Sequence, residues 1–96
     1  MRFEWDENKN RSNQAKHGIS FSKAREAFYD PNQIAAYNGV EDGEDRWKTF
    51  GLIGYLSVIV VISTFRDDYS GEEIIRIISA RPALPYERAF YETENG

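Results

Sequence analysis

The stretch LSVIVVISTFR, residues 56–66, most constrains how this chain can fold. It is apolar at consecutive positions through its middle and is rich in the β-branched residues that favour strands. A strand that is apolar on both faces must be covered on both faces, so we expect it at the centre of a sheet. Its apolar run is far shorter than the roughly 20 residues that a membrane-spanning helix needs.

Further strands are predicted on both sides of this central stretch. The pattern of residues 45–54, DRWKTFGLIG, fits a strand, in which alternate side chains lie on opposite faces. A tight turn at 54–55 then leads into the central strand, and a loop with Asp and Gly leads out of it. We expect a small antiparallel sheet. Its predicted strands are residues 2–5, 33–39, 45–54, 56–66 and 72–81.

Capping signals predict helices around this sheet. An aspartate before residue 7 and a glycine after residue 17 indicate a polar first helix over 7–17. Residues 19–31 predict a second, amphipathic helix that packs on the core. Pro85 starts a short C-terminal helix over 87–92. We therefore expect one α+β domain over residues 1–96, with the two N-terminal helices packed on one face of the sheet and the other face partly open.

The charge distribution leaves room for a basic surface. The net charge of −4 argues at first against a polyanionic partner. However, two acidic clusters and the C-terminal tail hold 10 of the 16 acidic residues, so the rest of the chain has 6 acids and all 12 bases. The alternative is that these charges are mixed over the surface. Because the chain lacks cysteine and an apolar N-terminal segment, we expect a cytoplasmic protein without a signal peptide.

Arginines on the predicted strands are candidate anion-binding residues. Arg76 lies within the β-branched segment IIRIIS, and Arg81, five residues on, would face the other side of a regular strand. Arg66 ends the central strand, and Arg46 and Lys48 lie on the strand before it. Guanidinium groups match phosphate, so cations that converge here would form an anion site. The alternative is structural ion pairing with a carboxylate near the N-terminus, at Glu4, Asp6 or Glu7.

The first helix ends on Lys16 and His17, the only histidine of the chain. A histidine there complements the helix dipole, or, if it faces the arginines, it can transfer a proton. Together these residue types suit cleavage of RNA by attack of a 2′-OH on its phosphate. One histidine and no cysteine make a metal site unexpected, and we expect no cofactor. Five aromatic residues belong to the core or stack on bases: Trp5, Tyr37, Trp47, Tyr55 and Phe65.

Four segments together resemble the BrnT family of type II toxins. FEWDENKNRSNQAKHGISFSKAREAFYDP, RWKTFGLIG, VIVVISTFR and IRIISARPALPYERAFYE follow one another over residues 3–92. The resemblance implies a RelE-like fold and a metal-independent ribonuclease that lowers translation and growth. It also implies a BrnA-like antitoxin that neutralises the toxin and makes any contact with operator DNA. A heterotetramer with the antitoxin is one assembly that the resemblance allows, and no membrane contact is implied.

The resemblance also assigns roles to individual positions. As catalytic residues it implies His17, Lys16, Arg66, Arg76 and Arg81, and as RNA-binding residues Arg46 and Lys48. The chain departs from the family pattern after residue 81, where relatives tend to have several basic residues but this chain keeps only Arg88. Weaker attraction for RNA, or a different antitoxin contact, would follow. The alternative function is a non-catalytic interaction or corepressor module, which the net charge of −4 and the lone histidine favour.

Overall fold

The computed structural model describes residues 1–95, and every predicted helix and strand is present in it. The C-terminal helix is longer than predicted, and the second helical segment divides into a short α-helix and a 3-10 helix. In chain order the elements are β1 (Arg2–Glu4), α1 (Glu7–His17), α2 (Phe21–Ala24), η1 (Arg25–Tyr29), β2 (Ile34–Glu41), β3 (Glu44–Ile53), β4 (Ser57–Asp67), β5 (Glu73–Pro82) and α3 (Pro85–Asn95).

The five strands form one sheet in the order β1-β5-β4-β3-β2, with the apolar strand β4 at its centre as predicted. Three neighbouring pairs are antiparallel, but β1 runs parallel to β5. The prediction of an antiparallel sheet is therefore wrong at this edge, and the fold is α+β with a mixed sheet. Hairpins force antiparallel pairing on β2 to β5, whereas β1 comes from the far end of the chain and has no such constraint.

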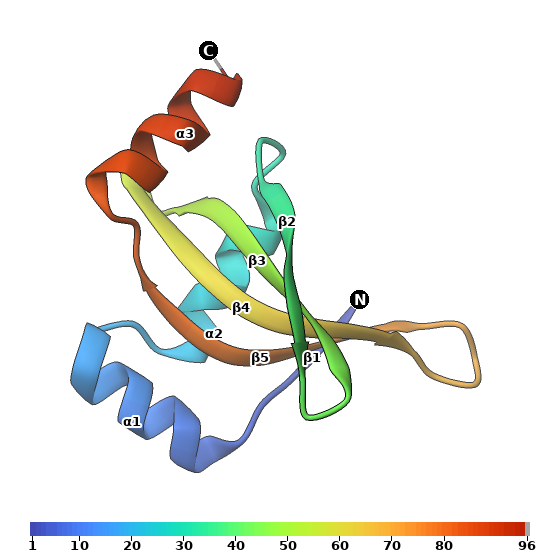
Figure 1. The fold of residues 1–96 in the computed structure, drawn as a ribbon. Coiled ribbons are helices and arrows are strands. Elements are labelled where there is room, and N and C mark those ends of the chain that lie inside the picture. Colours follow the sequence, from blue (N-terminus) through green and yellow to red (C-terminus); the bar gives the residue numbers. More distant parts are fainter. Residues whose placement is uncertain (96) are drawn as a thin grey trace.

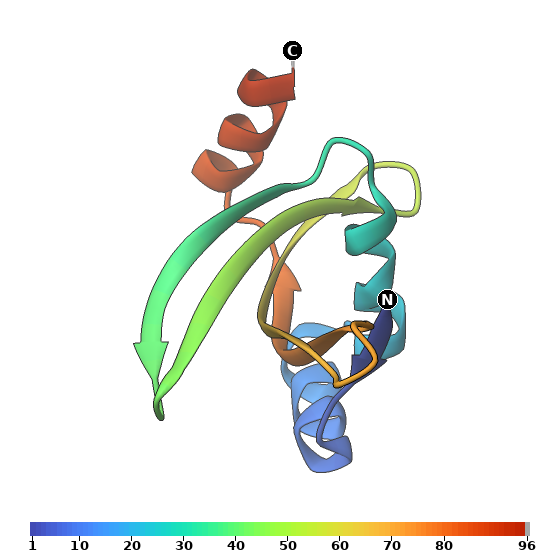
Figure 2. The same ribbon diagram turned by 90° about the vertical axis from the view of Figure 1, so that its right-hand side faces the viewer.

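The second helical segment packs on one face of the sheet, as predicted. Phe21, Ala24, Ala27 and Phe28 are buried in the larger of two apolar clusters. A Cβ atom at Gly51 of β3 would lie 2.6 Å from the carbonyl oxygen of Ala27, so the glycine lets η1 approach the sheet closely. Figure 2 shows α2 and η1 on one side of the sheet and the β2–β3 hairpin curling toward the other side.

Helix α1 covers the edge of the sheet rather than the same face as α2, which corrects the predicted arrangement (Figure 1). It lies beside β5, beyond the end of the short strand β1. The buried Asn13 amide donates to the Ala80 carbonyl (2.8 Å) and accepts from the Ala80 N–H (3.1 Å), as a neighbouring strand would. This contact explains why so polar a helix is stable here. The amide side chain provides hydrogen bonds for backbone groups at the edge of β5.

Helix α3 covers one end of the opposite face. Its Tyr91 packs against Phe50, Val58 and Val60 in the second apolar cluster. The Tyr91 hydroxyl donates to the carboxylate of Asp30, and burial together with this carboxylate raises the pKa of Tyr91 to about 12. In residues 1–95 no helix is long and apolar enough to cross a membrane. The RelE-like arrangement that the resemblance implies stays a prediction.

Candidate functional site

A β-bulge in β5 decides which arginines share a face. The pairing of β4 with β5 shifts by one residue near its middle, so Thr64 lies opposite Arg76 and Val60 lies opposite Arg81. Because Val60 and Thr64 are four residues apart on β4, both arginines point to the same side of the sheet. The prediction that Arg81 faces away from Arg76 is wrong, since it assumed a regular strand.

The other predicted cations lie on this side too. Lys48 of β3 lies opposite Ile62 of β4, which lies opposite Ser79 of β5, so these residues form one row across the sheet. Because alternate residues of a strand share a face, Arg46 of β3 and Arg66 of β4 lie on this side as well. The rows of Arg76 and Arg81 are four β4 residues apart, or roughly 13 Å. We call this surface the arginine face. It comprises Arg46, Lys48, Arg66, Arg76 and Arg81, and it is the side of the sheet opposite α2.

At one end of this face, Glu4, Arg66 and Arg76 form a group that we call the Glu4 cluster. Glu4 lies directly opposite Arg76 in the β1–β5 pairing. The Arg66 guanidinium donates to Glu4 Oε1, and Arg76 Nη1 is 3.8 Å from the same oxygen. The hydrogen bond from Arg66, followed by the two guanidinium charges, holds the pKa of Glu4 below its ordinary value. The predicted alternative of an ion pair is thus confirmed here, with all three side chains partly exposed.

At the other end, Arg81 makes a two-fold contact with Glu87 of α3. Its Nη1 and Nη2 donate to Oε1 and Oε2 at 2.6 and 2.9 Å, and the Leu84 N–H donates to Oε1 at 2.9 Å. The Glu87 side chain is only 3% exposed. The hydrogen bonds from Arg81 lower the pKa of Glu87, although burial opposes them, and they raise the pKa of Arg81. This pair fixes the start of α3 against β5.

The two cations of β3 have different surroundings. Arg46 is mostly buried and contacts two acidic residues of the β2–β3 hairpin, Glu41 at 3.4 Å and Asp42 at 3.9 Å. Lys48 makes no ion pair within residues 1–95, and its charge contributes to the lowered pKa of Glu87. Arg46 therefore holds the hairpin, whereas Lys48 is available to an anionic ligand.

The end of α1 reaches the same surface from its edge. Lys16 and His17 line a shallow pocket of about 220 Å³ together with Ile78 and Ser79 of β5. Ser79 lies opposite Ile62, in the row between those of Arg76 and Arg81. The structure thus places the lysine and the histidine beside the middle of the arginine face, with His17 half-buried and Lys16 exposed.

Comparisons with known proteins give the family of the chain. A family model described as "Ribonuclease toxin, BrnT, of type II toxin-antitoxin system" matches residues 5–87. The chain belongs to the BrnT family. A 1.1 Å crystal structure of the ribonuclease toxin BrnT from Brucella abortus is similar, with a TM-score of 0.62 and 30% identity over 88% of this chain and 97% of that one. Among curated proteins, none matches the chain.

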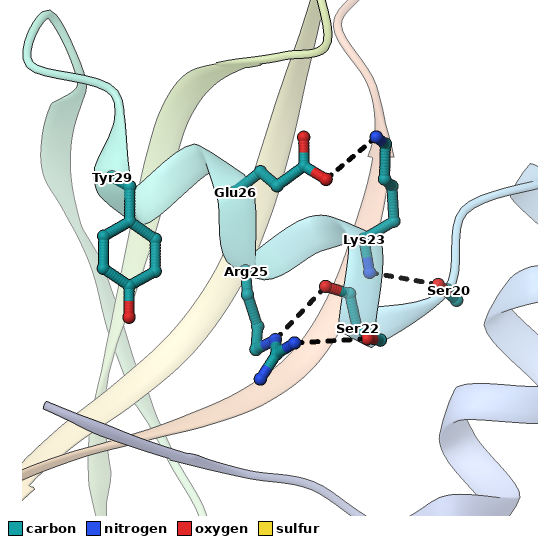
Figure 3. Close-up of a pocket in the computed structure, with 6 residues that line it drawn as sticks. All are labelled: Ser20, Ser22, Lys23, Arg25, Glu26 and Tyr29. Atoms are coloured by element: carbon teal, nitrogen blue, oxygen red, sulfur yellow. Dashed lines mark hydrogen bonds and ion pairs between the residues drawn. The ribbon is translucent and has the colours of Figure 1, made fainter.

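A second surface pocket of this BrnT-family chain lies on the other side of the sheet. Figure 3 shows it along α2 and η1, where Lys23 and Glu26 pair at 2.8 Å and Arg25 donates to Ser22. Lys23 and Glu26 are paired with one another, Arg25 is hydrogen-bonded to Ser22, and the whole sheet separates this pocket from the arginine face. It is therefore not part of the candidate site.

Of the five aromatic residues named from the sequence, Tyr37 lines a pocket on the arginine face. Trp5 packs on the helix side of the sheet, where Phe65 also contacts Trp47. Sequence reasoning missed Tyr86 and Phe90 of α3, which border a pocket on the arginine face. Their spacing of four residues on a helix was the available signal, because it places both rings on one side.

Proposed function

We propose that this BrnT-family chain, as a single domain over residues 1–96, is a toxin that cleaves RNA on its arginine face and thereby lowers translation and growth. One observation carries the proposal: the bulge in β5 puts Arg76 and Arg81 on the same face as Lys48 and Arg66. The match to a family described as ribonuclease toxins supports the same reaction class.

The Glu4 cluster is the proposed site for the scissile phosphate. Arg66 and Arg76 are 51% and 39% exposed, so a phosphate oxygen can reach both guanidinium groups. Phosphate would compete with the Glu4 carboxylate for these donors. Two guanidinium groups beside the phosphorus would then stabilise the charge that develops in the transition state, which is the largest contribution expected in such a reaction.

His17 and Lys16 are proposed to transfer protons. Attack by the 2′-oxygen forms a new P–O bond and releases its proton to a base, and the departing 5′-oxygen takes up a proton from an acid. Histidine suits both steps because its charge changes near neutral pH. Since protein side chains supply the charge and the protons, no metal ion or cofactor is required. Within residues 1–95 no group of three or more His, Cys, Asp or Glu residues is placed to hold a metal.

Arg81, Arg46 and Lys48 are proposed to extend the contact with RNA beyond the scissile phosphate. Lys48 supplies an unpaired ammonium group among the described residues. Arg81 and Arg46 are already bound to carboxylates, which favours a role in positioning α3 and the β2–β3 hairpin. The sequence prediction that Arg81 is catalytic is therefore the less favoured alternative, and Arg76 is the residue on which we test catalysis.

A type II toxin implies an antitoxin partner. We propose a BrnA-like antitoxin that covers the arginine face, makes any operator-DNA contact itself, and assembles with the toxin into a heterotetramer in the cytoplasm. The alternative is a non-catalytic interaction or corepressor module. It is favoured by the carboxylate partners that each arginine of this face has and by the net charge of −4.

Growth and RNA integrity after induced expression test the proposal. We expect arrest and RNA decay with wild type but not with Arg76→Ala or His17→Ala, at equal amounts of folded protein. Arg25→Ala, on the other side of the sheet, should behave as wild type. Cleavage by the purified chain should persist in EDTA. Unimpaired growth and intact RNA with folded wild type would support the non-catalytic alternative.

A further inference from the structure

The arginine face contains a pocket that the proposed chemistry does not use. It lies between α3 and the β2–β3 hairpin and has a volume of about 350 Å³. Its aromatic residues are Tyr37, Phe50, Tyr86 and Phe90, and Lys48, Glu87 and Asn38 are polar residues along it. Such a combination of apolar walls with a few polar groups is typical of sites for small planar ligands.

Two of the aromatic rings of the pocket keep much of their surface exposed to solvent. Phe50 is buried in the sheet, and Phe90 meets it edge-on at a centroid distance of 5.3 Å and an interplanar angle of 63°. Phe90 and Tyr86 remain 41% and 71% exposed. Large aromatic side chains that stay this exposed beside a pocket offer a flat surface on which a nucleobase can stack.

The polar groups of the pocket suit a nucleotide. Lys48 is two strands and one row away from Arg76 of the Glu4 cluster, so roughly 12 Å separate their Cα positions. Its ammonium group makes no ion pair within residues 1–95, so it can bind a phosphate next to the scissile one. The Asn38 amide offers both a donor and an acceptor to a base edge.

We propose that this pocket binds one nucleobase of the RNA substrate, adjacent to the scissile phosphate, and so gives the enzyme a base preference. The inference rests on the proposed ribonuclease function. A partner helix fits the pocket less well, because such a helix needs an unbroken apolar strip for residues at i, i+3, i+4 and i+7. Here the ammonium group of Lys48 interrupts the apolar surface.

Non-cleavable RNA tests the pocket separately from catalysis. We would titrate the ¹⁵N-labelled chain with 2′-O-methyl tetranucleotides that carry each of the four bases, or an abasic site, at one position. We expect amide shifts at Lys48, Phe50 and Phe90 that depend on the base and disappear with the abasic site. Tyr86→Ala should weaken binding about 5- to 150-fold. Tyr69→Ala, a fully exposed tyrosine in the β4–β5 loop, is the matched control and should bind as wild type.

The outcomes separate this inference from the proposed function. Binding in the pocket by a chain that cleaves no RNA would remove the ribonuclease proposal but keep the base site. RNA cleavage with no shifts at the pocket, and with unchanged affinity for Tyr86→Ala and Tyr86→Leu, would overturn the base site alone. Loss of antitoxin binding in Tyr86→Ala with full nucleotide affinity would assign the pocket to the antitoxin and also overturn it.

Discussion

The two ends of the arginine face use the same chemical pair in different surroundings. In the Glu4 cluster the carboxylate is 33% exposed and its partner Arg66 is 51% exposed. In the other pair Glu87 is 3% exposed and Arg81 is 32% exposed. Exposed ion pairs contribute little to stability because water competes for both charges, whereas a buried charge that loses its partner is costly. We infer that the first pair can exchange its anion and the second cannot.

The local backbone strengthens this difference. Glu87 is the third residue of α3, and its carboxylate also accepts the Leu84 N–H at the start of that helix. Glutamate at this position commonly satisfies a free backbone donor in this way. Glu4 lies on a three-residue edge strand. Among its described contacts, its carboxylate accepts no comparable hydrogen bond from a backbone N–H. The Arg81–Glu87 pair is thus part of the fold, while the Glu4 cluster has no such structural role and is the proposed phosphate site.

The largest effect is expected when the buried pair is broken. Arg81→Ala leaves the Glu87 carboxylate without its guanidinium and should lower the free energy of unfolding by roughly 2–4 kcal/mol. Urea denaturation measures this loss. The double variant Arg81→Ala with Glu87→Gln should recover part of it, because glutamine removes the unpaired charge and can still accept the Leu84 N–H. A loss below about 1 kcal/mol in the single variant would contradict the structural role of Arg81.

A substitution in the exposed Glu4 cluster should instead change activity more than stability. Arg76→Ala removes a guanidinium whose one ion pair within residues 1–95 is with Glu4, at 3.8 Å, so the free energy of unfolding should change by less than about 1 kcal/mol. RNA cleavage should fall about 10²- to 10³-fold, as when one transition-state donor is lost. Single-turnover cleavage assays measure this change, with Arg25→Ala as the control. Cleavage at the wild-type rate would exclude Arg76 from the site.

The fold was predictable to a large extent because its signals are local. Asp6 and Gly18 bound α1 as their capping preferences indicate, and Ser20 caps α2. The apolar residues of β4 placed that strand at the centre correctly. The parallel pairing of β1 was missed, because it depends on contacts between residues 2 and 74 that no local pattern reveals.

The candidate site was harder to predict for the same reason. The cationic residues were identified, and Glu4 was among the expected partners of the arginines. The bulge near Ile78 that turns Arg81 to the face of Arg76 has no sequence signal, since the segment IIRIISAR reads as a regular strand. The partner of Arg81 was not found either, because burial of Glu87 depends on how α3 packs.

Acid should distinguish the two carboxylates in the same experiment. Arg81 holds the pKa of Glu87 below its ordinary value of 4.5, so the pair contributes stability above about that pH and loses it as pH falls through the lower folded-state pKa. The pKa of Glu4 is lowered in the same direction, by Arg66, but that pair is exposed. Urea unfolding between pH 7 and 3 should therefore show a flatter acid dependence for Glu87→Gln than for Glu4→Gln. Equal flattening would mean that burial does not separate the two pairs.

The smallest effect is expected when the exchangeable anion is removed. Glu4→Gln frees Arg66 and Arg76 from their carboxylate, so non-cleavable RNA should bind about two- to fivefold more tightly, in line with the modest strength of exposed ion pairs. Binding titrations at low salt measure the gain, which should shrink as added salt screens the charges. Weaker binding would show instead that Glu4 orients the guanidinium groups for phosphate. Tighter binding with lost cleavage would make Glu4 the base, because it already lies against both arginines that hold the phosphate.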